Sequence, residues 1–193
     1  MESVMTLNIP RFHWLLIVLS AFTISGCSGG EDTVAEKPAP VHIESGDECH
    51  VCGMIISGFP GPKGEAITGD RQRVRKFCST RELFAWKLQP ENIHQTDTLY
   101  VHDMAQTDWQ NPDDTALVDA RDAFYVAGSD RKGAMGPTLA SFALESDARD
   151  FAKTHGGEVL KYAQITLEHV SGGMAMGNMA GAASMEDMAR SSE

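Results

Sequence analysis

The chain has 193 residues, of which 42% are hydrophobic and 22% are charged. These proportions exclude a collagen-like or wholly disordered protein, and a mean hydropathy of −0.23 excludes a membrane protein with many spans. The formal net charge is −11, because 27 Asp and Glu residues outnumber 16 Lys and Arg residues. Such a surface repels phosphate polymers, so it argues against nucleic-acid binding and favours a cation as partner. Four cysteines are too few for a disulfide scaffold of this length.

Residues 1–26 are predicted to be a signal peptide. The uncharged run Trp14–Ile24 has the length of a signal-peptide core and is too short to span a bilayer as a helix. It leads into Ile24-Ser25-Gly26-Cys27, which resembles the bacterial lipobox, in which the cysteine is lipidated. An ordinary secretory signal with a chance cysteine is the alternative. We expect a protein anchored through Cys27 on the periplasmic side of the cell envelope, and Ser28 favours the outer membrane over the inner one.

Two segments of low hydrophobicity flank the central part of the chain. Residues 27–48 contain two prolines and six acidic residues, and they are predicted to be a flexible tether. Residues 171–193 combine small residues with five methionines and are predicted to be a disordered tail. These methionines are either incidental or a loose thioether site for Cu(I). Gathering neutral thioethers orders a flexible chain, so we expect such a site to bind weakly.

The sequence between these segments alternates strand-like and helix-like patterns. In chain order it predicts a hairpin of 65–68 and 72–78, a helix capped by Ser79 and stopped by Pro90, and a strand at 98–104. Strands at 123–127 and 138–144, a helix capped by Ser146 and closed by Gly156, and a strand at 158–167 follow.

The order strand, strand, short capped helix, strand therefore occurs twice. This repetition predicts an α+β fold with an internal duplication. We expect a domain at 49–170 made of two similar small β/α units that pack together, at about 49–108 and 116–170.

The segment Cys-His-Val-Cys-Gly-Met at residues 49–54 carries the clearest chemical signal. If it is extended, His50, Cys52 and Met54 project to one side. Imidazole, thiolate and thioether make a soft ligand set that suits Cu(I) and suits Mg²⁺, Ca²⁺ or Mn²⁺ poorly. Same-face residues lie about 6.6 Å apart along a strand, so two of them can hold one ion. All three converge only if Gly53 lets the backbone bend.

A further ligand has to come from elsewhere in the chain. Met104, on a predicted strand, is the first candidate, and Met135, in a glycine-rich loop, is the second. The sequence thus predicts a low-coordinate Cu(I) site built on Cys52 and Met54, completed by one of these methionines or by a histidine such as His50.

Three other interpretations of the cysteines remain open. Cys49 and Cys52 form either a plain disulfide or a thioredoxin-like redox pair, although the following residues lack the helix that such a pair needs. Alternatively, Cys49, Cys52, Cys78 and a histidine bind zinc. On the copper interpretation Cys78 is a buried apolar residue. Cys52→Ser is then expected to abolish tight Cu(I) binding, and Cys78→Ser to leave it nearly unchanged.

Six motifs follow one another along residues 49–167. They are Cys52-Gly53-Met54, Phe59-Pro60-Gly61-Pro62-Lys63, Tyr100-Val101-His102-Asp103-Met104, Phe124-Tyr125-Val126-Ala127-Gly128-Ser129-Asp130, Gly133-Ala134-Met135-Gly136-Pro137 and His155-Gly156-Gly157. In this order, and together with the lipobox, they resemble the NosL family of lipoproteins, which are accessory to the maturation of nitrous oxide reductase.

The resemblance implies a periplasmic Cu(I) carrier rather than an enzyme. Such a carrier passes copper towards the copper centres of nitrous oxide reductase and works with a membrane ABC-type maturation complex. The resemblance also implies two similar β/α units, and it places the Cys-x-Met pattern of the family on Cys52 and Met54. Two rival functions are a cysteine-dependent enzyme, such as a thiol-disulfide oxidoreductase, and a lipid-anchored scaffold of the maturation complex.

Overall fold

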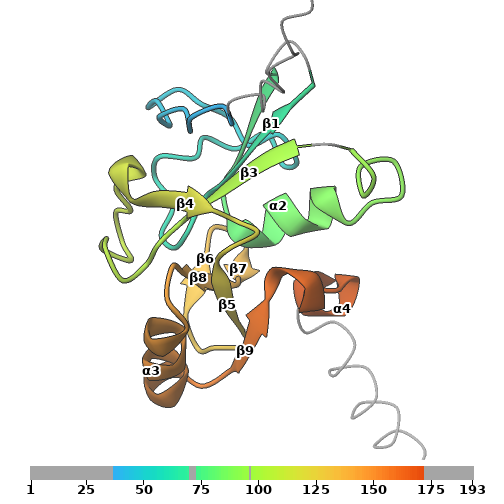
Figure 1. The fold of residues 1–193 in the computed structure, drawn as a ribbon. Helices are drawn as coiled ribbons and strands as arrows, with labels where there is room; N and C mark the ends of the chain where they lie inside the picture. The colour runs from blue at the N-terminus through green and yellow to red at the C-terminus, as the bar shows by residue number, and fades with distance from the viewer. Residues whose placement is uncertain (1–36, 70–72, 96, 172–193) are drawn as a thin grey trace, which may run out of the picture. The chain divides into compact units, whose positions relative to one another are not determined.

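The computed structural model describes residues 37–69, 73–95 and 97–171 (Figure 1). The predicted signal peptide, the lipobox cysteine and all of the methionine-rich tail beyond Ser171 lie outside these residues. Within the described part of the chain, no helix is both long enough and apolar enough to cross a membrane.

The first half of the domain is a four-stranded antiparallel sheet with one helix. Its strands are β1 (Gly64–Thr68), β2 (Arg73–Phe77), β3 (Asp97–His102) and β4 (Leu117–Asp119), in the order β2-β1-β3-β4. Helix α2 (Thr80–Lys87) follows β2, and a 3₁₀ turn (Asp114–Ala116) precedes β4. The helix packs closely on β1, because a Cβ at Gly64 would lie only 2.7 Å from the Cβ of Leu83.

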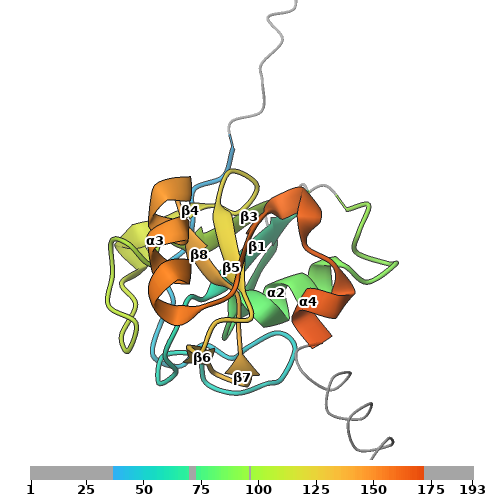
Figure 2. The ribbon, with the colours of Figure 1, turned by 90° about the horizontal axis from the view of Figure 1, so that it is seen from below.

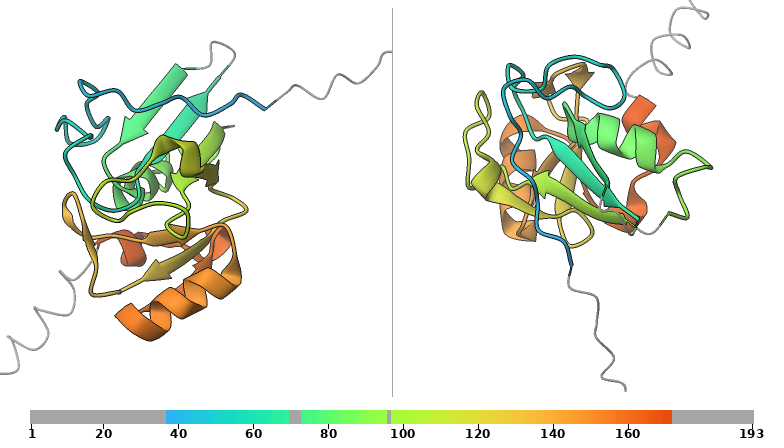
Figure 3. Two further views of the ribbon diagram at one scale, coloured as in Figure 1. Left: turned by 90° about the vertical axis from the view of Figure 1, so that its left-hand side faces the viewer. Right: turned by 90° about the horizontal axis from the view of Figure 1, so that it is seen from above.

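The second half repeats the order strand, strand, helix, strand in a three-stranded sheet. Strands β5 (Phe124–Ala127), β8 (Ala140–Phe142) and β9 (Glu158–Lys161) pair in the order β8-β5-β9, and α3 (Glu145–His155) joins β8 to β9. A small hairpin of β6 (Lys132–Gly133) and β7 (Gly136–Pro137) follows β5, and a 3₁₀ turn (Tyr162–Gln164) and α4 (Leu167–Ser171) follow β9. Figure 3 shows α3 on the face of this sheet that is turned away from the first one.

The two halves share one topology. In each half the first strand is central, and it pairs antiparallel with the second strand and with the strand after the helix. Figure 2 shows the equivalent central strands, β1 and β5. The predicted α+β fold with two similar units is therefore confirmed.

Several predicted boundaries in the second unit are wrong. Helix α3 begins at Glu145 after Leu144, with no side-chain cap, so Ser146 is not its capping residue. Acidic side chains in the first turn complement the helix dipole in place of a cap. The strand predicted at 158–167 ends at Lys161. Beyond it the Thr166 N–H donates to His169 Nδ1 at 3.0 Å, a local contact that favours the helical turn of α4 over an extended chain.

Residues 37–47, which we call the strap, lie against the sheet face opposite α2 (Figure 3). The Val41 N–H donates to both carboxylate oxygens of Glu65 at 3.1 Å. The Tyr100 hydroxyl donates to the Pro38 carbonyl at 2.6 Å, and the Lys76 ammonium pairs with Asp47 at 2.5 Å. Every residue of β1, which lies between the strap and α2, is buried. The part of the predicted tether that the structure describes is thus held against the domain.

The buried carboxyl of Glu65 makes the stability of the strapped sheet depend on pH. Burial raises the pKa of Glu65 from 4.5 to about 7. Between these values the folded chain holds a proton that the unfolded chain has lost, so stability falls as pH rises from 4.5 to 7. Glu65→Gln is therefore expected to raise the free energy of unfolding at pH 8 by about 2 kcal/mol and to change it little at pH 4.5.

Urea unfolding of both proteins at the two pH values measures this effect, with the exposed Glu91→Gln as matched control. An equal change at both pH values would show that the Glu65 carboxyl does not titrate in this range.

Candidate metal centre

The cysteine motif forms a tight turn and not an extended segment. The Gly53 N–H donates to the Cys49 carbonyl at 2.8 Å, and the Cys49 N–H donates to the Met54 carbonyl at 2.9 Å. Gly53 has a φ of 72°, a conformation that side chains rarely adopt, so glycine permits the turn. As a result Cys49 and Cys52 lie on the same side, although in a strand they would lie on opposite faces.

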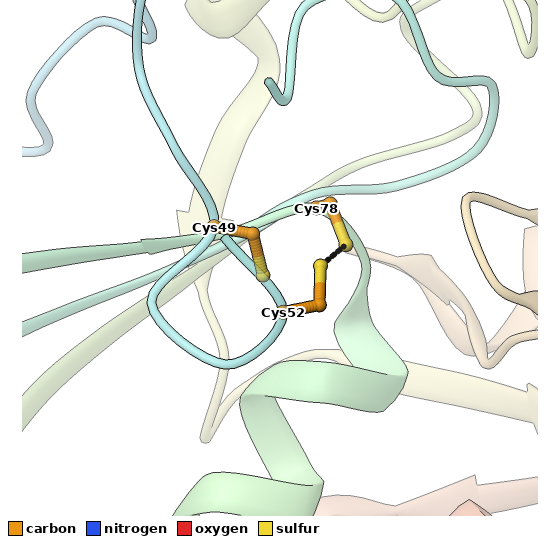
Figure 4. Close-up of side chains that lie close together, drawn as sticks. All are labelled: Cys49, Cys52 and Cys78. Atoms are coloured by element: carbon orange, nitrogen blue, oxygen red, sulfur yellow. Dashed lines mark hydrogen bonds between the residues drawn. The ribbon is translucent and has the colours of Figure 1, made fainter. Parts of the chain in front are cut away.

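A third cysteine completes the site from the junction between β2 and α2. The Cys78 sulfur lies 3.6 Å from the Cys52 sulfur, and the three sulfurs of Cys49, Cys52 and Cys78 lie within 4.8 Å of one another (Figure 4). All three are free thiols. Cys49 and Cys78 are buried, whereas Cys52 is half-buried and faces the solvent side of the cluster. We call these residues the thiol trio.

Backbone contacts fix the trio on both sides. The His50 N–H donates to the Lys76 carbonyl at 2.8 Å, which attaches the turn to the end of β2. On the other side the Thr80 N–H, two residues after Cys78, donates to the Pro62 carbonyl at 3.1 Å. The loop that contains Pro62 is held by the buried Lys63 ammonium, which donates to the carbonyls of Phe59, Pro60 and Gly61. The sulfurs are thus brought together before any ligand binds.

The close contact of the thiols changes their acidity. A hydrogen bond from Cys78 lowers the pKa of the Cys49 thiol, and the same contact together with burial raises the pKa of Cys78. The Cys49 thiol therefore loses its proton readily, and a bound cation would have to displace the remaining protons.

The spacing of the trio fits a single thiophilic ion. Three sulfurs that each lie about 2.3 Å from one metal ion are about 3.7–4.0 Å apart. The distances in the trio need only small side-chain rotations to reach this geometry. Sulfur ligands of this kind select Cu(I) or zinc over the hard cations.

The other residues of the predicted site are distributed around the trio and beyond it. Met54 is half-buried two residues after Cys52. Met104 follows β3 and packs in a second apolar cluster with Trp109, whereas Cys52 packs against the first cluster. Met135 lies between β6 and β7 with 47% of its surface exposed. The structure thus gathers Cys52 with two other cysteines, and ligation by the three methionines stays a prediction.

The histidines His102 and His50 differ in their contacts within the fold. His102, which shares the predicted strand with Met104, is fully buried, and its Nδ1 accepts the Lys63 N–H at 3.0 Å. Its Nε2 lies 3.1 Å from Asp114, so both ring nitrogens have partners. The His50 ring packs edge-on against Phe77 and Trp86, with centroid distances of 6.0 and 6.2 Å.

We expect His50 to act through this aromatic packing. His50→Phe preserves the ring and is expected to keep Cu(I) affinity within about threefold, whereas His50→Ala should lower stability by about 1 kcal/mol. Competition titration and thermal unfolding of the two variants measure these effects. A loss of more than tenfold in the Cu(I) affinity of His50→Phe would instead make the imidazole a ligand.

Cys78 is the residue that the copper interpretation of the sequence missed, and Cys49 had no assigned role in it. The zinc alternative did contain all three cysteines, so the useful signal was the Cys-x-x-Cys spacing together with a cysteine at a strand end. The sequence could not show that these two features meet.

Known proteins of one family are similar to this chain. The sequence model of the NosL family matches residues 40–170. The copper-binding lipoprotein NosL of Stutzerimonas stutzeri is 52% identical over 151 residues, or 78% of each chain, and that of Achromobacter cycloclastes is 31% identical over 159 residues, or 81% of each. The crystal structure of the copper chaperone NosL from Shewanella denitrificans superposes with a TM-score of 0.65 at 45% identity, covering 66% of this chain and 96% of that one. The chain therefore belongs to the NosL family.

Proposed function

We propose that this protein is a Cu(I) carrier that delivers copper for assembly of the copper centres of nitrous oxide reductase. The observation that carries the proposal is the thiol trio, because three free, convergent sulfurs form a soft site of the size of one ion. Its relatives are named as copper-binding and copper chaperone proteins, which supports copper over zinc as the cargo.

The partial exposure of Cys52 suits transfer of the ion. Cys49 and Cys78 hold an ion from the buried side, and Cys52 is the sulfur that an incoming ligand reaches first. A ligand from the recipient binds the under-coordinated ion before the old ligands leave, so copper moves without release into water. A methionine such as Met54, Met104 or Met135 completes the site between transfers. This is carriage of a substrate ion and involves no catalysed reaction.

The proposal includes the location and the partners of the protein. Lipidation of Cys27 anchors the chain on the periplasmic side of the envelope, with the outer membrane favoured by Ser28. The segment before the strap tethers the domain to the membrane surface. The recipient is nitrous oxide reductase, reached directly or through the ABC-type maturation complex. The methionine-rich tail after Ser171 collects copper weakly.

A complementation experiment tests delivery. Cells that lack this protein receive either the wild-type gene or Cys52→Ser, and the copper content of the purified nitrous oxide reductase is measured at limiting copper. We expect wild type to restore copper loading and Cys52→Ser to fail at equal protein levels. Ser57→Ala, an exposed change in the loop after the cysteine turn, serves as matched control. Full copper loading with Cys52→Ser would favour the scaffold alternative.

A further inference from the structure

We infer that the apo protein has a redox-controlled site, in which Cys52 and Cys78 form a disulfide that excludes copper until it is reduced. The effect of this disulfide on copper binding rests on the proposed function, but its formation depends only on the three thiols. The sequence had suggested a pairing within the Cys-x-x-Cys motif, between Cys49 and Cys52.

The geometry favours Cys52 and Cys78 as the pair. Their sulfurs are 3.6 Å apart and point towards one another (Figure 4). A disulfide has a sulfur–sulfur distance of about 2.05 Å, so the sulfurs need to approach by about 1.5 Å. Side-chain rotation supplies this movement, while the backbone on both sides stays held by the contacts of His50 and Thr80.

Solvent access favours the same pair. Cys52 is half-buried, whereas Cys49 and Cys78 have exposed fractions of 2% and 0%. A small disulfide of the glutathione type therefore reaches Cys52 first. The Cys52 sulfur attacks one sulfur of the oxidant and forms a mixed disulfide, and its proton leaves with the small thiol that is released. Cys78, whose sulfur lies 3.6 Å from the Cys52 sulfur, then passes its proton to the neighbouring Cys49 thiolate, attacks the Cys52 sulfur and releases the second small thiolate, which takes up that proton.

Atoms and electrons balance over these two steps. One small disulfide is reduced to two small thiols, two protein thiols are oxidised to one disulfide, and the two protons leave with the small thiols. The product retains Cys49 as a free thiol. Cu(I) and the disulfide compete for the same two sulfurs, so bound copper protects the trio from oxidation and oxidation prevents reloading.

Peptide mapping distinguishes the pairings directly. Trypsin cleaves after Lys63 and after Lys76, so Cys49 and Cys52 share one peptide and Cys78 lies in the separate peptide Phe77–Arg81. The protein is purified from membranes in detergent, reduced, freed of metal and treated with oxidised glutathione. Non-reducing mass spectrometry then detects the linked peptides, and the reduced sample is titrated with Cu(I) in parallel.

We expect a cross-link between the two peptides in wild type and in Cys49→Ser. In Cys78→Ser we expect a glutathione adduct on Cys52 in place of the cross-link. Oxidised wild type should lose tight Cu(I) binding and regain it after reduction. A bond within the Cys49–Cys52 peptide, or loss of the cross-link in Cys49→Ser, would overturn the inference. Failure of the reduced protein to bind Cu(I) would instead overturn the proposed function, whatever the peptide map shows.

Discussion

Cys52→Ser is expected to lower the affinity for Cu(I) by more than about a hundredfold, because partners outside the ligand sphere already account for about 10–100-fold in metal affinity. The serine oxygen is a hard ligand that does not replace a thiolate on Cu(I). The affinity is measured by competition with a chromophoric Cu(I) chelator under reducing conditions. Unchanged thermal unfolding would show that the loss is local to the site.

Cys78→Ser provides the comparison. Because Cys78 lies 3.6 Å from Cys52, we now expect Cys78→Ser to weaken binding as well, although the sequence alone predicted almost no effect. A Cys78→Ser protein with wild-type affinity would remove Cys78 from the site. A Cys52→Ser protein with wild-type affinity would remove Cys52 from the site altogether.

The largest expected loss of stability comes from Lys87→Met. The Lys87 ammonium donates to the Asp97 carboxylate at 2.6 Å and to the carbonyls of Asn92 and Gln95 at 2.9 Å. The two charged side chains are only 5% and 0% exposed. Removing one partner leaves a buried carboxylate without its counter-charge, which costs about 3–5 kcal/mol of unfolding free energy.

Urea unfolding measures this effect, with Lys153→Met as matched control. Lys153 pairs with Asp150 at 2.7 Å, but both side chains are at least 70% exposed, so its loss should cost less than about 0.5 kcal/mol. The double variant Lys87→Met, Asp97→Asn should recover part of the stability because it removes the buried charge. Equal effects of the two lysine variants would contradict the account of the Lys87–Asp97 pair.

Local patterns in the sequence predicted most of the first unit. The Ser79-x-x-Glu82 motif predicted the start of α2, and the structure has Ser79 accepting the Glu82 N–H. The strand-like runs at 65–68 and 72–78 located β1 and β2. The strap could not be predicted in the same way, because its fixed position depends on contacts between residues far apart, such as Val41 with Glu65.

The ligands of the metal site also depend on contacts between residues that are far apart in the sequence. Periodicity alone cannot choose between an extended segment and a turn at Cys49–Met54, and the backbone contact between His50 and Lys76 decides it. Cys78 is 26 residues from Cys52 in the sequence, and only the folded sheet brings the two sulfurs together. The residue types predicted a soft site, whereas the set of ligands required the fold.

Cu(I) titration combined with X-ray absorption spectroscopy tests the central claim most directly. The account predicts that the reduced protein retains one Cu(I) per chain against a strong chelator, with sulfur as the main neighbour of the ion. Zn²⁺ should not displace the Cu(I). Failure to retain Cu(I), or a copper ion surrounded mainly by nitrogen and oxygen, would contradict the assignment of the thiol trio as the carrier site.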